Sequence, residues 1–149
     1  MKFFMQCDPP TTTHQANLRV NTNRATGQQF IGKRESEKGA IWKKKFWALA
    51  HPYKPEKPFD GPLKLHLVFV YPWPKTRSHA GVKMFKETIP DFDNIGKTLV
   101  DVMSDLGFWV NDSRIADGRT TKLFSYNTGI AVSLRKLTER DLDEFIEYL

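Results

Sequence analysis

The chain has 149 residues, of which 40% are hydrophobic and 13% aromatic, enough for one compact core and too little for two full domains. We therefore expect one domain over residues 1–149. The single cysteine, Cys7, excludes an internal disulfide, and the lack of paired Cys and His spacings argues against a zinc site. No run approaches roughly 18 apolar residues, and the first residues lack the apolar centre of a signal peptide. We expect a soluble protein of the reducing cytoplasm with no membrane partner.

The net charge of +6 lies in the first 60 residues, which carry eleven Lys and Arg against five Asp and Glu. A second local excess, formed by Lys75, Arg77, Lys83 and Lys86 against Glu87, precedes an acidic motif. A phosphate backbone suits such a surface, because neutralising phosphates releases condensed counterions. The alternative is that scattered lysines only keep the protein soluble.

The N-terminal third predicts a strand, a basic arm and a helix. Residues 3–7 read as a strand that ends at Asp8, Pro9 and Pro10. The next stretch, through about Arg34, is rich in Thr, Asn, Gln and Gly and predicts a long loop or arm. Its basic residues are Arg19, Arg24, Lys33 and Arg34. A helix is expected from about Ser36 to His51, with Ile41, Phe46 and Leu49 among its apolar positions.

The strongest strand signal is residues 63–71, LKLHLVFVY, in which apolar residues alternate with a period of two. Its second face becomes apolar towards the end, which favours a central strand. His66 on this pattern is more typical of a packed or exposed histidine than of a ligand. Pro72 and Pro74 end the strand, and residues 73–89 predict a basic loop.

The C-terminal third predicts strands at residues 108–110, 115–126 and 129–137. Thr138 can then cap a final helix, with Asp141 at its third position. That helix repeats Leu142, Phe145, Ile146 and Leu149 at helical spacing, a stripe for core packing or for a second subunit. The order of elements predicts an α+β domain with a mixed sheet and helices against it.

Between these regions lies an acidic segment, residues 89–122, which contains an amphipathic helix from Asp93 to Gly107. Its predicted buried face is Ile95, Leu99, Val102, Met103 and Leu106. On the opposite face, Asp93, Lys97 and Asp101 follow one another at i, i+4 and i+8. Asp91 precedes this helix by two residues, so that two carboxylates can point into one space.

A third carboxylate, Asp112, follows the predicted strand at residues 108–110, and a helix with a returning strand would bring it beside Asp91 and Asp93. Three converging carboxylates repel one another unless a cation lies between them, and oxygen ligands favour Mg²⁺ or Mn²⁺. Such a site can hold a metal-activated water and a scissile phosphate together.

Structural interpretations of the same residues remain open. Asp93 can cap the helix, Lys97 can pair with Asp93 and Asp101, and Asp112 can occupy a turn. A calcium loop is a weaker alternative: Asp91, Asp93 and Gly96 match its first, third and sixth positions, but the twelfth position lacks the essential glutamate.

The segment PDFDNIGK, followed by VDVMSDLGFWVNDSRI, resembles the RusA family of Holliday junction resolvases. The family pattern is an Asp-x-Asp-Asn with a lysine four residues after the second aspartate, a helical aspartate, and an acidic pair in a turn. The residues at the corresponding places are Pro90, Asp91, Asp93, Asn94, Lys97, Asp101 and Asp112. The match is specific over residues 89–122.

The resemblance implies a homodimeric, magnesium-dependent endonuclease that cuts branched DNA, with Mn²⁺ as a substitute metal and no small-molecule cofactor. It implies that Asp91, Asp93 and Asp112 bind the metal and that Lys97 is the essential basic residue. Asp101 would support Lys97 without touching metal. It also implies a bacterial or phage-encoded protein. A two-fold dimer suits a four-way junction, because two symmetric cuts need two equivalent sites.

One position departs from the family pattern: the first residue of the acidic pair is Asn111, which leaves one negative charge fewer and predicts altered metal binding. The basic residues near 19–34 and 75–86, together with Lys122, are predicted to bind DNA phosphates. The expected function is resolution of Holliday junctions in DNA recombination and repair. The alternative is a protein that binds junctions without cutting them, with a structural acidic cluster.

Overall fold

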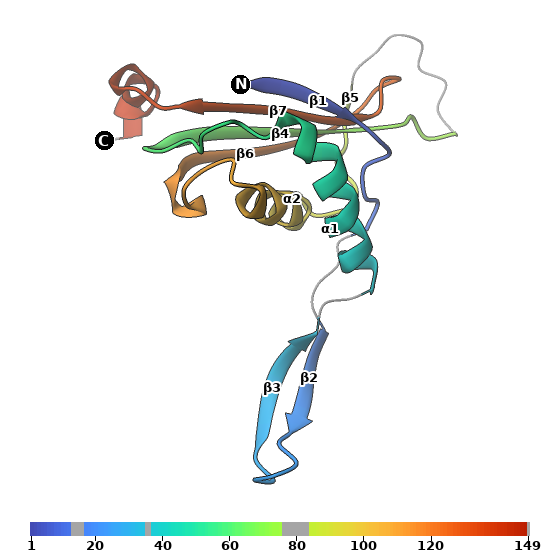
Figure 1. Ribbon diagram of the computed structural model, residues 1–149. Helices are drawn as coiled ribbons and strands as arrows, with labels where there is room; N and C mark the ends of the chain where they lie inside the picture. The colour runs from blue at the N-terminus through green and yellow to red at the C-terminus, as the bar shows by residue number, and fades with distance from the viewer. Residues whose placement is uncertain (13–16, 35–36, 76–83, 149) are drawn as a thin grey trace.

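The structure, a computed structural model, describes residues 1–12, 17–34, 37–75 and 84–148 (Figure 1). Its main sheet has five strands in the order β1-β7-β4-β6-β5. The strands are β1 (Lys2–Gln6), β7 (Gly129–Lys136), β4 (Leu63–Tyr71), β6 (Ile115–Phe124) and β5 (Met84–Phe85). β4 and β6 run parallel, and the other neighbours are antiparallel. The predicted mixed sheet and α+β class are confirmed.

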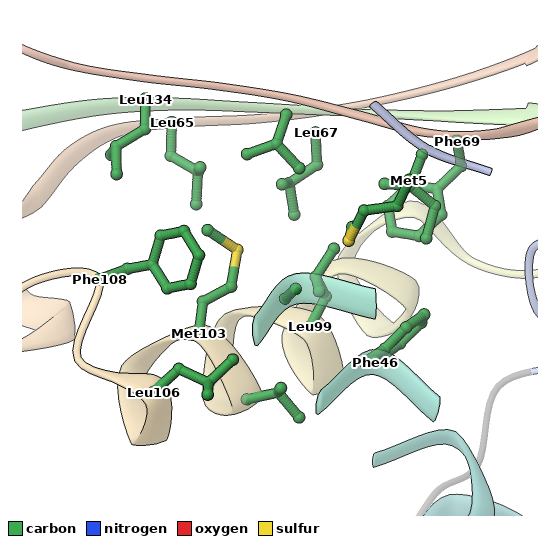
Figure 2. Packing of buried hydrophobic residues seen from close by; sticks show 14 of the residues in the cluster. Met5, Phe46, Leu65, Leu67, Phe69, Leu99, Met103, Leu106, Phe108 and Leu134 are labelled. Atoms are coloured by element: carbon green, nitrogen blue, oxygen red, sulfur yellow. The ribbon is translucent and has the colours of Figure 1, made fainter. Parts of the chain in front are cut away.

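β4 is a central strand, as its sequence predicts, because it pairs with β6 on one side and β7 on the other. Its alternating residues Leu63, Leu65, Leu67 and Phe69 are buried at one face of the sheet. The helices α1 (Glu37–Ala50) and α2 (Phe92–Leu106) both cover this face (Figure 1). Figure 2 shows side chains of the sheet and of both helices meeting in one apolar core.

α2 buries the predicted stripe of Ile95, Leu99, Val102, Met103 and Leu106. It ends at Gly107, whose φ of 79° lies in the left-handed region that glycine adopts without a steric penalty. The helix also approaches the sheet closely at Gly96, where an added Cβ would lie 2.9 Å from Thr120 Oγ1. The missing side chain at this position therefore sets the distance between α2 and β6.

α1 confirms the predicted helix but not every predicted apolar position. Phe46 and Ala50 are fully buried, whereas Ile41 is 62% exposed. The stripe that faces the core follows positions 42, 46 and 50 at a spacing of four, with Trp42 partly buried, and Ile41 falls about 100° away from position 42. None of the described helices is long and apolar enough to cross a membrane.

The basic region before α1 is a β-hairpin, where the sequence predicted a loop or arm. β2 (Asn17–Thr22) pairs antiparallel with β3 (Gln29–Arg34). The turn is closed by the Asn23 amide, which donates to the Gln28 carbonyl at 2.9 Å, and Gly27 supplies the positive φ. Figure 1 shows this hairpin, called the arm below, projecting away from the main sheet.

Two further predictions need correction. Residues 108–110 form only an isolated bridge between Trp109 and Phe59, because, among the described residues, their backbone hydrogen bonds to an extended segment go to Phe59 alone. The final helix is a 3₁₀ helix, η3 (Glu139–Tyr148), and Leu142 is 62% exposed, so this residue does not pack into the core of its own chain; a contact with a second subunit stays a prediction. The predicted cap is present, since the Thr138 amide donates to Asp141 Oδ2 at 2.8 Å. The side chains at 145, 146 and 149 lie outside the described residues.

The predicted basic loop at residues 73–89 contains one short strand, β5, which pairs with the last residues of β6. Arg77 and Lys83 lie outside the described residues. A short 3₁₀ helix, η1 (His51–Tyr53), follows α1, and another, η2 (Asp112–Arg114), precedes β6.

Candidate active site

The N-terminal turn of α2 presents the first two carboxylates. Asp91 is the N-cap residue, with extended backbone and no side-chain capping bond. Asp93, Lys97 and Asp101 are all exposed along one face of the helix, as their spacing predicts. Within the described part of the chain, no ion pair joins Lys97 to either aspartate. Among the described residues, Asp93 therefore makes no capping bond, and Lys97 forms no ion pair with Asp93 or Asp101.

The segment of residues 86–91, called the strap below, leads from β5 into α2. The Lys122 ammonium on β6 donates to the Thr88 carbonyl at 2.8 Å and to the Pro90 carbonyl at 2.5 Å. The Lys86 amide donates to the Lys122 carbonyl at 2.9 Å. Lys122, predicted to bind DNA, thus fastens the backbone immediately before Asp91 to the end of β6.

Lys86 lies at the same end of β6. Its Nζ is 5.1 Å from the ring centroids of both Tyr71 and Phe124, a cation–π arrangement. Partial burial and the positive charge of Lys122 lower the pKa of the Lys86 ammonium. A second cation of the predicted DNA-binding set is therefore packed against the protein at this end of the sheet.

The third carboxylate, Asp112, is the first residue of η2 and is exposed. Asn111 caps this turn, because its Oδ1 accepts from the Ser113 amide at 2.8 Å. Arg114, the last residue of η2, has its Nε 3.1 Å from Asp60 Oδ1, which ties the turn to the segment before β4. The role that the structure gives Asn111 is therefore that of a cap.

Asp112 does not meet Asp91 and Asp93 within one chain, which corrects the expected convergence. Lys122, beside the strap, pairs with Phe69 near the end of β4, whereas Ile115, just after η2, pairs with Leu63 at its beginning. Seven strand residues at about 3.3 Å each separate these two levels by roughly 23 Å. The reason is that α2 and β6 run in opposite directions. The segment before α2 therefore lies at the end of β6, whereas Asp112 lies just before the beginning of β6 (Figure 1).

The donor set for a divalent cation is accordingly incomplete in a single chain. Asp91 and Asp93 offer the oxygen ligands that Mg²⁺ prefers. However, the described residues contain no group of three or more His, Cys, Asp or Glu that could hold a metal ion. The three carboxylates of one copy do not fit a shared metal.

The described residues that flank the arm in sequence lie beside the N-terminal half of α2. Residues on either side of the hairpin, Thr12 and Gly39, line a small cavity together with Asn94 and Thr98 of α2. The predicted DNA-binding residues Arg19, Lys33 and Arg34 lie in β2 and β3, and Arg24 and Lys75 are exposed. The described residues that flank the basic arm in sequence therefore lie near the start of the helix that carries Asp93.

Two charged residues of β6 received no role from the sequence. Asp117 lies 2.8 Å from Lys64 Nζ and 3.1 Å from Arg119 Nε. Burial opposes ionisation of Asp117, but the hydrogen bonds from Lys64 and Arg119 outweigh it and lower the pKa of this carboxyl. The sequence feature that could have predicted this ion pair is the placement of opposite charges two positions apart in a strand. His66, in turn, bonds to Thr121 Oγ1 at 2.9 Å.

Comparison with known proteins gives one family. The family described as Endodeoxyribonuclease RusA matches residues 9–135, which span both the arm and the acidic segment. The chain is also 26% identical over 113 residues to a Bacillus subtilis (strain 168) protein named Uncharacterized protein YqaN. That similarity covers 70% of this chain and 79% of the relative.

Proposed function

Because the chain belongs to the RusA family of endodeoxyribonucleases, we propose that it resolves Holliday junctions by magnesium-dependent hydrolysis of phosphodiester bonds, in DNA recombination and repair. One observation carries this proposal: the acidic motif Asp91-x-Asp93 with Lys97 stands exposed at the start of α2, near the residues that flank a basic arm in sequence. A phosphate backbone bound by the arm would pass close to these carboxylates.

We propose a homodimer in which each metal site is shared. Asp91 and Asp93 of one copy supply two ligands, and the partner's Asp112 supplies the third. The separation of about 23 Å within a chain supports this arrangement, and a two-fold dimer then holds two equivalent sites for two symmetric cuts. When bound, Mg²⁺, or Mn²⁺ in its place, would supply a Lewis acid and lower the pKa of a coordinated water.

Lys97 is the proposed charge-stabilising residue. It lies one helical turn after Asp93 and is exposed, so that its ammonium can approach a phosphate bound at the helix end. Asp101, one turn further, would keep Lys97 oriented by its negative charge. Their common face on α2 supports both roles.

The test compares cleavage of a synthetic four-way junction by the parent and by Asp93→Asn, with magnesium and then with EDTA. We expect paired, metal-dependent nicks in the parent and none in the variant, which should still bind the junction. Asp105→Asn is the matched control, since it removes the same charge from an exposed position at the other end of α2. Absence of cleavage by the parent with any divalent metal would refute the nuclease.

Mixing two inactive variants tests the shared site. Asp93→Asn and Asp112→Asn copies, once combined into heterodimers, contain one site with all three native carboxylates. We expect nicking of the junction to return in the mixture but not in either variant alone. Persistent inactivity of the mixture, together with an active parent, would place all metal ligands in one copy.

The second candidate is a protein that binds junctions without cutting. The separated carboxylates of a single chain are the observation that favours it. Junction binding by the parent without cleavage, in magnesium or manganese, would select this candidate.

A further inference from the structure

A groove of about 260 Å³ lies between α1 and α2, which pack side by side on one face of the sheet (Figure 1). Trp47 and Val102 supply its apolar lining, and Lys43, Lys44 and Asp105 complete it. Its volume is slightly below the roughly 300 Å³ at which pockets for drug-sized ligands begin, so that it suits a single flat ring system. The groove contains none of the residues that the acidic motif predicts for catalysis.

Trp47 is the tryptophan that water reaches most. It is 44% exposed, whereas the other three tryptophans are half-buried or buried. Single exposed apolar side chains are common on protein surfaces and by themselves indicate no ligand. Trp47 differs because it borders a groove and because Lys43 and Lys44 precede it by one helical turn, on the same side of α1. The groove therefore combines an accessible aromatic ring with two cations.

The charge around Trp47 is positive. α1 contains four lysines and a single acidic residue, Glu37. At the groove itself, Lys43 and Lys44 outnumber Asp105, so that the lining residues carry a net positive charge. An ammonium group binds phosphate as a compact point charge. The groove therefore suits a ligand in which a phosphate lies next to a flat ring, which is the chemistry of a nucleotide.

We propose that this groove binds an unpaired base of single-stranded DNA, which stacks on Trp47 while the neighbouring phosphates lie at Lys43 and Lys44. Proteins bind single strands in this way, because every base has a flat face and every linkage has a phosphate. A paired base cannot bind here, since its neighbours in the duplex cover both of its faces. The inference deepens the proposed function and rests on it for the nature of the ligand, a DNA strand.

An acidic peptide would also satisfy the charge, but the shape of the groove favours a base. Val102 is 2% exposed and offers little surface to an inserted aliphatic side chain. The accessible apolar surface belongs mainly to the indole ring of Trp47, which is a stacking surface. The family gives a second reason, since it is a family of endodeoxyribonucleases and DNA is their substrate.

The groove and the proposed metal ligands lie along the same helix. Asp93 and Asp105 are 12 positions apart in α2, which corresponds to about 18 Å at 1.5 Å per residue. One strand of a duplex has a phosphate about every 3.4 Å, so that about five nucleotides cover this distance. An unpaired tail of at least about five nucleotides would thus let one branched DNA occupy the groove and the metal site together. The substrate class that follows is branched DNA with a single-stranded branch.

Oligonucleotide binding tests the stacking contact. The probe is a fluorescein-labelled oligothymidylate of about ten nucleotides, within the usual site sizes for single strands, and its anisotropy in EDTA gives the dissociation constant. Full stacking contributes a factor of about 5 to 150 in affinity, and Trp47 offers one partly exposed ring. We therefore expect Trp47→Leu to weaken binding about 5- to 10-fold and Trp47→Tyr, which retains a flat ring, to weaken it less. An abasic strand of the same length keeps the phosphates and should bind the parent and Trp47→Leu equally.

Lysine substitutions test the phosphate contacts separately. Lys44→Gln should reduce the slope of log K against log salt by about 0.7 for the single strand. Lys57→Gln is the matched control, because it removes the same charge from an exposed position before β4 and should leave the slope unchanged. Circular dichroism would show whether each variant retains the fold of the parent.

Equal affinity of the parent and Trp47→Leu for the thymidine strand would overturn the proposal, and so would equal binding of the thymidine and abasic strands by the parent. A glutamate-rich peptide containing leucine, bound by the parent more tightly than the strand and released by Trp47→Leu, would assign the groove to an acidic protein and overturn it as well. None of these measurements uses cleavage. A failed groove with an active parent leaves the proposed nuclease standing, and Trp47-dependent strand binding by a parent that cuts nothing refutes only the nuclease.

Discussion

Replacing Lys122 with methionine separates two roles for this residue. The sequence predicts that Lys122 binds a DNA phosphate, whereas its ammonium bonds to the Thr88 and Pro90 carbonyls of the strap. Methionine keeps the aliphatic stem and removes the charge and all three donors. We expect the strap, and with it Asp91, to lose its fixed position while the arm keeps its grip on DNA.

The size of the effect follows from the two bonds. A hydrogen bond from a charged donor contributes about 1.5–3 kcal/mol when it is well buried. One of these bonds is exposed and the other only partly buried, so that solvent reduces the pair to about 1–2 kcal/mol in total. If the strap must be ordered for cleavage, this energy lowers kcat by up to about 5- to 30-fold.

The assay measures single-turnover cleavage of a four-way junction and, separately, the salt dependence of junction binding. We expect Lys122→Met to lower the cleavage rate and to leave the slope of log K against log salt unchanged. Arg24→Gln, in the exposed turn of the arm, is the control for a phosphate contact and should reduce that slope by about 0.9. A reduced slope in Lys122→Met, with normal cleavage at saturating junction, would show that the ammonium contacts DNA and would refute the positioning role.

Three further outcomes are expected. Gly129→Ala should lower the free energy of unfolding by at least about 2 kcal/mol in urea titrations, because the added Cβ would lie 2.5 Å from the Met5 carbonyl oxygen; an unchanged midpoint would contradict this packing. Asn111→Ala should remove a cap that contributes about 0.5–1 kcal/mol to the free energy of unfolding, which thermal melts would show. Asn111→Asp should keep the cap and lower the magnesium concentration needed for cleavage, which metal titrations would show. Asp117→Asn should destabilise the protein at neutral pH, and this effect should shrink below about pH 4: the folded-state pKa of Asp117 lies below its ordinary 3.8, so its stabilisation is lost as pH falls through the folded value. Equal destabilisation at pH 2 and pH 7 would contradict this linkage.

Regular hydrophobic patterns were read correctly from the sequence. The period of two at residues 63–71 and the stripe of α2 both matched buried faces, because these elements pack against the core over their full length. The patterns failed where local chemistry decides. The segment expected as a loop or arm is a hairpin whose strands alternate weakly, and Leu142, expected to pack into the core or to meet a second subunit, is exposed.

The carboxylates show the corresponding limit for the site. Asp91, Asp93 and Lys97 are close in the chain, and helical geometry alone placed them correctly on one exposed turn and face. Asp112 lies 19 positions after Asp93, and nothing in that spacing reveals the direction of β6. Lys122 shows the same limit, since its partners Thr88 and Pro90 lie 34 and 32 positions away.

The sequence by itself determined the family and the α+β class, and it predicted the residues proposed to carry the chemistry, because motifs and short periodicities are local properties of the chain. Only the tertiary structure decided that α2 and β6 run in opposite directions. This arrangement leaves Asp91 and Asp93 at one end of the sheet and Asp112 at the other. The packing of elements distant in sequence sets that arrangement, because the pairing of β6 with β4 and the position of α2 depend on residues far apart in the chain.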